Sequence, residues 1–121
     1  MEKLTNKEKG QLGEEIAAKY LEQQGYKILE RNFHYSKNAE IDIIAMDKQT
    51  LVFVEVKART SLNTGHPFEA IDEHKLEKLR TAIFGYLSTH NTNFKGYRCD
   101  GIAVIGFEQP QIQHLKNIYF N

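Results

Sequence analysis

Hydrophobic and polar positions alternate in the middle of the chain with the period of two that is typical of β-strands. Residues 40–59 contain two runs rich in Val and Ile that are joined by a short polar turn, and this pattern predicts a β-hairpin. If the loop has an even number of residues, the register places Asp42 directly opposite Glu55. Opposed strand residues have Cβ atoms about 5 Å apart, and like charges there are destabilising. The predicted hairpin therefore needs a compensating cation.

Apolar residues recur with helical spacing on both sides of this hairpin. Thr5 and Glu8 form a capping-box pattern, which predicts a helix from Asn6 to about Gln24. A second apolar stripe predicts a helix that is capped by Asp72 and ends near residue 89. This order of elements, α-β-β-β-α-β-β, predicts an α/β fold with a mixed central sheet of four to five strands flanked by two helices. The strands expected in addition to the hairpin are residues 26–33, 97–106 and 111–119.

The first of these strands alternates imperfectly. Its pattern puts Ile28 and Glu30 on one side of the sheet, and Leu29 and Arg31 on the other. The polar residues 34–38 that follow are typical of a loop.

Glu14 lies on the apolar face of the first helix, together with Gly10, Gly13, Ala17 and Leu21. A carboxylate on the core-facing side of a helix is unusual and needs a partner. From the helix pattern alone, the simplest partner is a cation at the edge of the sheet.

Asp42, a turn and then Glu55-Val56-Lys57 resemble the PD-(D/E)XK nuclease motif of the restriction-endonuclease-like fold. The wider pattern is similar to the YraN family of uncharacterised bacterial proteins, which resemble archaeal Holliday-junction resolvases in fold. Ala39 departs from it, because the family usually has a glycine there. The resemblance covers nearly the whole chain and rests on five ordered motifs: Gly10-x-x-Gly13-Glu14, Arg31-Asn32-Phe33, Glu40-Ile41-Asp42, Val54-Glu55-Val56-Lys57-Ala58-Arg59 and Glu69-Ala70-Ile71.

The resemblance implies a three-layer core and a metal-dependent nuclease. In that interpretation Asp42, Glu55 and the backbone carbonyl of Val56 hold Mg²⁺ or Mn²⁺, and Glu14 reaches over the sheet to contribute directly or through a water. Such ions take one or two carboxylates and keep several waters. Lys57 then orients the attacking water or stabilises charge on the phosphate. The implied catalytic residues are Glu14, Asp42, Glu55 and Lys57.

Three further cations are candidates for binding substrate phosphates. Arg59 shares the strand face of Lys57 and would contact a neighbouring phosphate. Lys75 lies near the start of the second helix, where the helix dipole does not favour a cation, and Lys37 lies in the polar segment before the hairpin. A solvated surface position is the alternative for each lysine.

Composition adds a constraint on partners. The chain has 121 residues, 40% of them hydrophobic, with no linker of low complexity, so we expect a single domain over residues 1–121. Its 16 basic and 16 acidic residues cancel, whereas nucleic-acid-binding proteins usually carry a basic excess. Binding would therefore require a local basic patch, a metal or a homodimer that merges two patches. Among nucleic acids we expect DNA in preference to RNA.

Several alternatives stay open or are disfavoured. A non-catalytic nucleic-acid-binding or protein-interaction module on the same fold is the alternative function, and an ion pair centred on Lys57 without metal is the alternative site. The five histidines show no zinc-like spacing. The one cysteine, Cys99, fits an inert core thiol and a reducing compartment. Apolar runs are too short to span a bilayer, so we expect a cytoplasmic protein without membrane contact.

Overall fold

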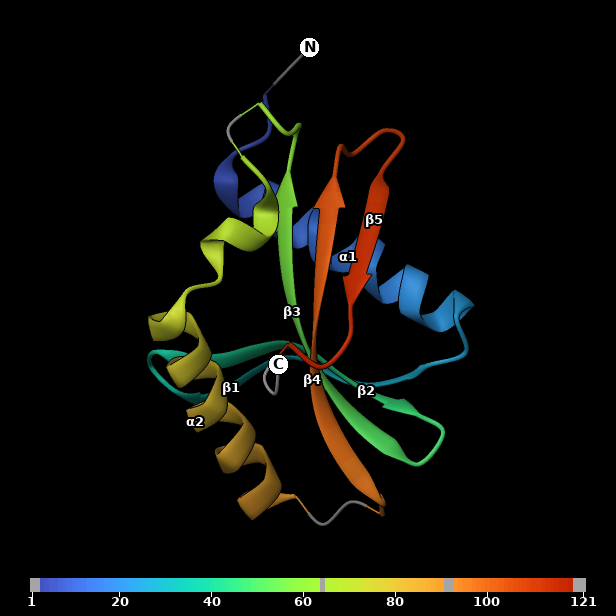
Figure 1. Ribbon diagram of the computed structural model, residues 1–121, viewed down its shortest axis with the longest axis vertical. Coiled ribbons are helices and arrows are strands. Elements are labelled where there is room, and N and C mark those ends of the chain that lie inside the picture. The colour runs from blue at the N-terminus through green and yellow to red at the C-terminus, as the bar shows by residue number, and fades with distance from the viewer. Residues whose placement is uncertain (1–2, 64, 91–92, 119–121) are drawn as a thin grey trace.

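A mixed five-stranded sheet forms the centre of the computed structural model, which describes residues 3–63, 65–90 and 93–118 (Figure 1). The strands lie in the order β1-β2-β3-β4-β5. Strands β3 and β4 run parallel, and every other neighbouring pair is antiparallel. The elements are α1 (Asn6–Gln23), β1 (Lys27–Ser36), β2 (Ala39–Asp47), β3 (Thr50–Arg59), the 3₁₀ helix η1 (Pro67–Ala70), α2 (Glu73–Thr89), β4 (Gly96–Ile105) and β5 (Gln111–Leu115).

One helix covers each face of the sheet, as the sequence predicted (Figure 1). Helix α1 packs Ala17 and Leu21 against Val52 and Val54 of β3. Helix α2 packs against the opposite face, where Phe53 of β3 is buried. Because both faces of β3 and β4 are covered, residues 51–54 of β3 and 102–105 of β4 are continuous apolar runs, as is general for parallel strands, and the charged residues lie outside these runs. The α/β class, the order of elements and the three layers are therefore confirmed.

The hairpin of β2 and β3 has the predicted register. Its loop is the two residues Lys48 and Gln49, and Lys48 adopts a positive φ of 57°. Pairing runs from Asp47↔Thr50 to Ile43↔Val54. One further step along this register reaches Asp42 and Glu55.

Close packing between α1 and β3 depends on Gly13. A Cβ atom built at that residue would lie 2.7 Å from the Cβ of Ala58, so only glycine lets the helix approach the strand this closely. Gly10, predicted on the same face, is exposed instead and has no atom within 4 Å of such a Cβ. The helix begins with the predicted capping box of Thr5 and Glu8.

A β-bulge in β1 overturns the predicted sides of that strand. The register with β2 shifts between Ile28 and Glu30, and an extra residue in a strand reverses the side on which the following side chains lie. Arg31 therefore faces α1, where it contacts Glu14, and Glu30 lies near His90 of α2. The simple alternation expected from the sequence holds for Ile28 and Leu29 and was wrong beyond Leu29.

The boundaries of two strands also differ from the prediction. Strand β1 continues through residues 34–36, which were expected in a loop, so the connection to β2 is only the turn at Lys37 and Asn38. Ala39 is buried and has no positive φ, so β2 begins without the glycine of the family pattern. Strand β5 ends at Leu115, and residue 119 lies outside the described residues.

A network of buried polar side chains connects β5 to the rest of the sheet. Asp100 of β4 is fully buried and accepts hydrogen bonds from Arg98 Nε at 3.0 Å and from the amide of Asn117 at 3.0 Å. His114 Nε2 lies 2.8 Å from the same carboxylate, and its Nδ1 is 3.0 Å from the hydroxyl of Tyr20. Arg98 and Asp100 therefore form an ion pair within β4. No helix in the described parts of the chain is long and apolar enough to cross a membrane.

Candidate active site

The carboxylate of Asp42 is held in place by the backbone of the neighbouring strand. Its Oδ2 accepts a hydrogen bond of 2.8 Å from the amide of Val56. That bond fixes the side chain of Asp42 next to the residue that follows Glu55. The two carboxylates come together because the short hairpin loop sets the register of β2 against β3.

Burial and mutual repulsion make this carboxylate pair difficult to ionise. Burial, together with the charge of Glu55, raises the pKa of Asp42 to about 7, although the Val56 amide and Lys57 oppose the shift. Burial also raises the pKa of Glu55, again against the attraction of Lys57. Desolvation and a like charge both disfavour the ionised form of a carboxyl group. The site is therefore short of positive charge when both groups are ionised.

Lys57 makes an ion-pair contact with only one member of the pair. Its Nζ lies 3.4 Å from Glu55 Oε1. Within the described parts of the chain, no Lys or Arg nitrogen lies within 4.0 Å of the Asp42 carboxylate. The ion pair expected in the metal-free interpretation is present, but it leaves Asp42 with a backbone amide as its partner.

Glu14 approaches the same region from α1. Its Oε1 is 3.7 Å from Arg31 Nη2, so the expected edge salt bridge exists. The same oxygen is buried without a hydrogen-bond partner. Burial raises the pKa of Glu14 to about 7, with the charge of Asp42 as the next cause and Arg31 acting against both. Glu14 therefore contacts Arg31, and its pKa also depends on the charge of Asp42.

The donors present suit a hard divalent cation that keeps part of its water shell. They are the carboxylates of Asp42 and Glu55 and the carbonyl of Val56, with the unpartnered oxygen of Glu14 nearby. Across residues 3–63, 65–90 and 93–118, no group of three or more His, Cys, Asp or Glu side chains is arranged to hold a metal by itself. Mg²⁺ takes one or two carboxylates together with waters and substrate phosphate, so this small donor set fits it, whereas a closed site made only of protein ligands is absent from these residues.

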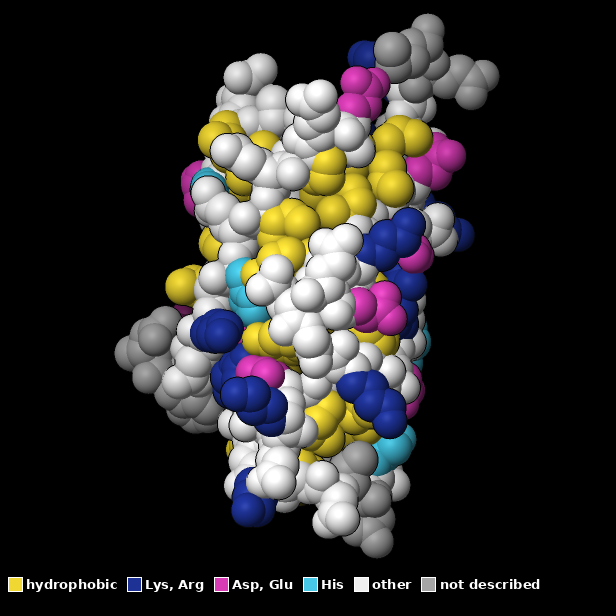
Figure 2. Space-filling model, turned by 90° about the vertical axis from the view of Figure 1, so that its right-hand side faces the viewer, with side chains coloured by type: hydrophobic (Ala, Val, Ile, Leu, Met, Phe, Trp, Pro, Cys, Tyr) yellow, Lys and Arg dark blue, Asp and Glu magenta, His cyan; other side chains and the backbone are white. Residues whose placement is uncertain are grey.

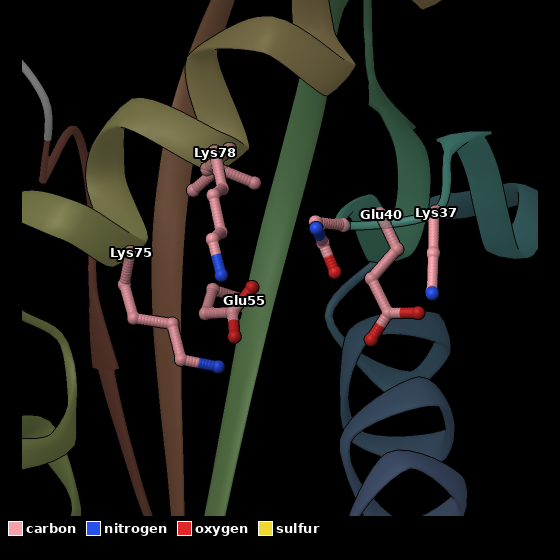
Figure 3. A pocket seen from close by; sticks show the side chains of 7 residues that line it. Lys37, Glu40, Glu55, Lys75 and Lys78 are labelled. Carbon is pink, nitrogen blue, oxygen red and sulfur yellow. The ribbon is translucent and has the colours of Figure 1, made fainter.

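A small basic cavity opens beside Glu55 (Figure 3). Its volume is about 220 Å³, and Lys75 and Lys78 of α2 line one side of it while Lys37 and Glu40 line the other. The structure thus brings two of the predicted phosphate-binding residues, Lys37 and Lys75, together. Lys78 was not predicted, although its spacing of three from Lys75 places both on one side of the helix.

Arg59, the third predicted phosphate contact, lies elsewhere. It lines a second hollow with Lys57, between the end of β3 and the start of α1, and its Nη1 donates to the carbonyl of Ala58 at 3.0 Å. Lys57 therefore connects two basic regions, because its ammonium contacts Glu55 while its side chain lines the second hollow.

Residues 13–104 match a family model described as "Uncharacterised protein family UPF0102". The chain belongs to this family. It is the YraN family whose motifs the sequence resembles, so that resemblance is confirmed. Among curated relatives, UPF0102 proteins from three organisms illustrate the similarity. The chain is 50% identical over 98 residues to the one from Caldanaerobacter subterraneus subsp. tengcongensis, covering 81% of this chain and 78% of that protein. The corresponding figures are 44% over 114 residues for Chlorobaculum parvum, with 88% of each covered, and 43% over 111 residues for Paenarthrobacter aurescens, with 90% and 91% covered.

The part of this UPF0102 protein that matches the family model contains the entire carboxylate and lysine site. Glu14 is the second residue of the matched region, and the residues that line the basic cavity end at Leu79. Residues 3–12 and the turn after β4 lie outside the matched region.

Proposed function

We propose that this UPF0102 protein is a metal-dependent nuclease that hydrolyses phosphodiester bonds. The observation that supports this most strongly is the half-buried pair Asp42 and Glu55, which repel each other beside a cavity that three lysines line. A pair that raises the pKa of both its members costs folding stability. A catalytic role for the ionised pair explains that cost.

Each residue of the chain has a distinct task in this proposal. Asp42 and Glu55 hold the cation, and the Val56 amide keeps Asp42 in its binding rotamer. A bound Mg²⁺ or Mn²⁺ polarises the phosphodiester and lowers the pKa of a water. Lys57, held 3.4 Å from Glu55, would orient the water and balance charge on the phosphate. Glu14 would contribute directly or through a water.

The basic cavity is the expected place for a backbone phosphate. Lys37, Lys75 and Lys78 surround it next to Glu55, and ammonium groups bind phosphate as point charges. Its volume of about 220 Å³ lies below the roughly 300–1,000 Å³ of pockets that enclose drug-sized ligands, which suits a phosphate better than a complete nucleotide. We expect DNA in preference to RNA, and a homodimer would merge two such basic regions.

A non-catalytic nucleic-acid-binding module is the second candidate. The Lys57–Glu55 contact and the Arg31–Glu14 contact favour it, because they compensate carboxylates without any metal. The net charge of zero is equally compatible with weak, local binding.

Metal binding separates the two candidates. Mg²⁺ and Mn²⁺ are titrated by calorimetry into the wild type, into Asp42→Asn/Glu55→Gln, and into Glu22→Gln/Glu73→Gln, which removes two exposed carboxylates as a matched control. The same proteins are then incubated with single-stranded, duplex and branched DNA and with RNA. We expect metal binding and cleavage in the wild type and the control, and loss of both in the site variant. Absence of metal binding in the wild type, even with nucleic acid present, would refute the nuclease and leave the binding module.

A further inference from the structure

We propose that an unpaired strand of nucleic acid leaves the carboxylate site along a basic track and places a base in an apolar hollow at the start of α1. The basic track is Lys57, Arg59 and Lys9, and the apolar hollow is lined by Leu4, Leu12 and Phe107. This inference rests on the proposed function, because it assumes that the substrate is a nucleic acid.

The basic track begins at the site itself. Lys57 contacts Glu55 through its ammonium and also lines a hollow of about 550 Å³ beside the start of α1. Arg59 and Lys9 line the same hollow, and no Asp or Glu is among its described lining residues. Lys57, Arg59 and Lys9 together form a local surface for successive phosphates in a chain whose total charge is zero, and Lys57 is the member that also contacts Glu55. The net charge of zero therefore does not argue against nucleic-acid binding, because the cations are clustered at one place.

The apolar hollow continues directly from the track. Lys9 and Thr60 line both hollows, so the two share a border. The second has a volume of about 680 Å³ and contains Leu4, Leu12 and Phe107, of which Leu4 and Leu12 are 37% and 36% exposed. Figure 2 shows hydrophobic side chains gathered near the end of the molecule where the chain begins, with Lys and Arg side chains beneath them. Apolar and cationic surfaces therefore adjoin.

This combination favours a single strand over a duplex. An unpaired base offers a flat face that stacks on aromatic and apolar side chains, whereas duplex bases already stack on one another. The five residue steps from Glu55 to Thr60 span about 16 Å of extended backbone, so a nucleic-acid strand with one phosphate at the site reaches the apolar hollow within a few nucleotides. A volume of about 680 Å³ lies in the range that encloses a ligand of nucleotide size. Glu108 also lines this hollow, and its negative charge disfavours a phosphate beside it.

Binding in EDTA tests the track without requiring catalysis. A fluorescently labelled oligothymidine and a duplex of equal length are titrated by anisotropy at several salt concentrations. The variants are Phe107→Ala and Lys9→Ala, with Phe84→Ala and Lys19→Ala as matched controls at exposed positions on α2 and α1. Thermal unfolding of each variant verifies that it folds.

We expect the wild type to bind the single strand more tightly than the duplex. Phe107→Ala should weaken single-strand binding at least about fivefold, as loss of one stacked base does, and Lys9→Ala should lower the slope of log K against log salt by about 0.7. The controls should change neither. Equal affinity for duplex and single strand, or equal effects of Phe107→Ala and Phe84→Ala, would overturn the proposal. So would a wild type that self-associates through this surface, detected by sedimentation as a dimer that Phe107→Ala dissociates.

The two proposals fail in different ways. Single-strand binding that depends on Phe107, without cleavage in Mg²⁺ or Mn²⁺, supports the track and contradicts the nuclease. Metal-dependent cleavage supports the nuclease, and if Phe107→Ala and Lys9→Ala leave single-strand binding unchanged, the track is contradicted.

Discussion

Asp42→Asn should stabilise the protein at alkaline pH in the absence of metal. The raised pKa of Asp42, about 7 against an ordinary 3.8, means that the folded protein binds more protons there than the unfolded chain between these values. Stability from this group is therefore complete below about pH 3.8 and is lost as the pH rises through about 7. An uncharged residue of the same shape avoids that loss and still accepts the hydrogen bond from Val56.

The size of the expected stabilisation follows from the pKa shift of Asp42 and from the hydrogen-bond acceptor that the new amide NH₂ lacks. A shift of about three units corresponds to about 4 kcal/mol, at about 1.4 kcal/mol for each unit. The penalty is shared with Glu55, whose pKa is raised as well, and the buried amide NH₂ forfeits about 1–3 kcal/mol where it has no acceptor. We therefore expect Asp42→Asn to be more stable by about 2 kcal/mol at pH 8. For a chain of this size that is about 8 °C in Tm.

The assay is thermal unfolding in EDTA from pH 4.5 to pH 8.5, with Glu22→Gln as the control for loss of an exposed carboxylate. The difference in Tm between variant and wild type should grow with pH, and the control should show no such trend. Excess Mg²⁺ should then raise the Tm of the wild type more than that of Asp42→Asn, because a ligand stabilises the state that binds it. A variant that is less stable than the wild type at pH 8 without metal would refute the reasoning.

Three other substitutions or treatments test the fold around the site. Gly13→Ala should destabilise the protein by about 1–3 kcal/mol in urea unfolding, because its Cβ would lie 2.7 Å from that of Ala58. Gly10→Ala has open space around its Cβ and should be neutral or stabilising. Equal losses of unfolding free energy in the two variants would contradict the packing argument. Asp100→Asn should cost about 3–5 kcal/mol at pH 7. Although burial opposes it, hydrogen bonding holds the pKa of Asp100 below its usual value, so the difference from wild type should vanish as the pH falls below about 4; a variant of unchanged stability at pH 7 would disprove the role of the network. Because burial raises the pKa of the Cys99 thiol, a thiol reagent should label it only in denaturant, and rapid labelling of the native protein would contradict its placement.

Asp42 and Asp100 differ in how their surroundings affect a negative charge. Asp100 is fully buried and receives hydrogen bonds from Arg98, His114 and a backbone amide. Asp42 is half-buried, receives one hydrogen bond from an amide and faces Glu55. The first arrangement stabilises a charge and the second penalises it. Opposite signs in the two Asn variants would therefore distinguish a structural carboxylate from one kept for binding.

Local patterns in the sequence determined most of the fold. Helix spacing, the capping box of Thr5 and Glu8, and the apolar runs around a two-residue turn predicted both helices and the central hairpin, because these signals depend on residues close in the chain. The register of that hairpin also followed from the turn, and with it the meeting of Asp42 and Glu55.

Tertiary structure alone decided the surroundings of that pair. The bulge in β1 turns the side chain of Arg31 toward Glu14. A rule of simple alternation along the strand does not predict this, because the bulge depends on how β1 pairs with β2. The cavity joins Lys37 to Lys75 and Lys78 across two layers, and the apolar hollow joins residues near the start of the chain to Phe107. Contacts between residues so far apart arise from how helices pack on a sheet, and a single sequence carries no local signal of that geometry.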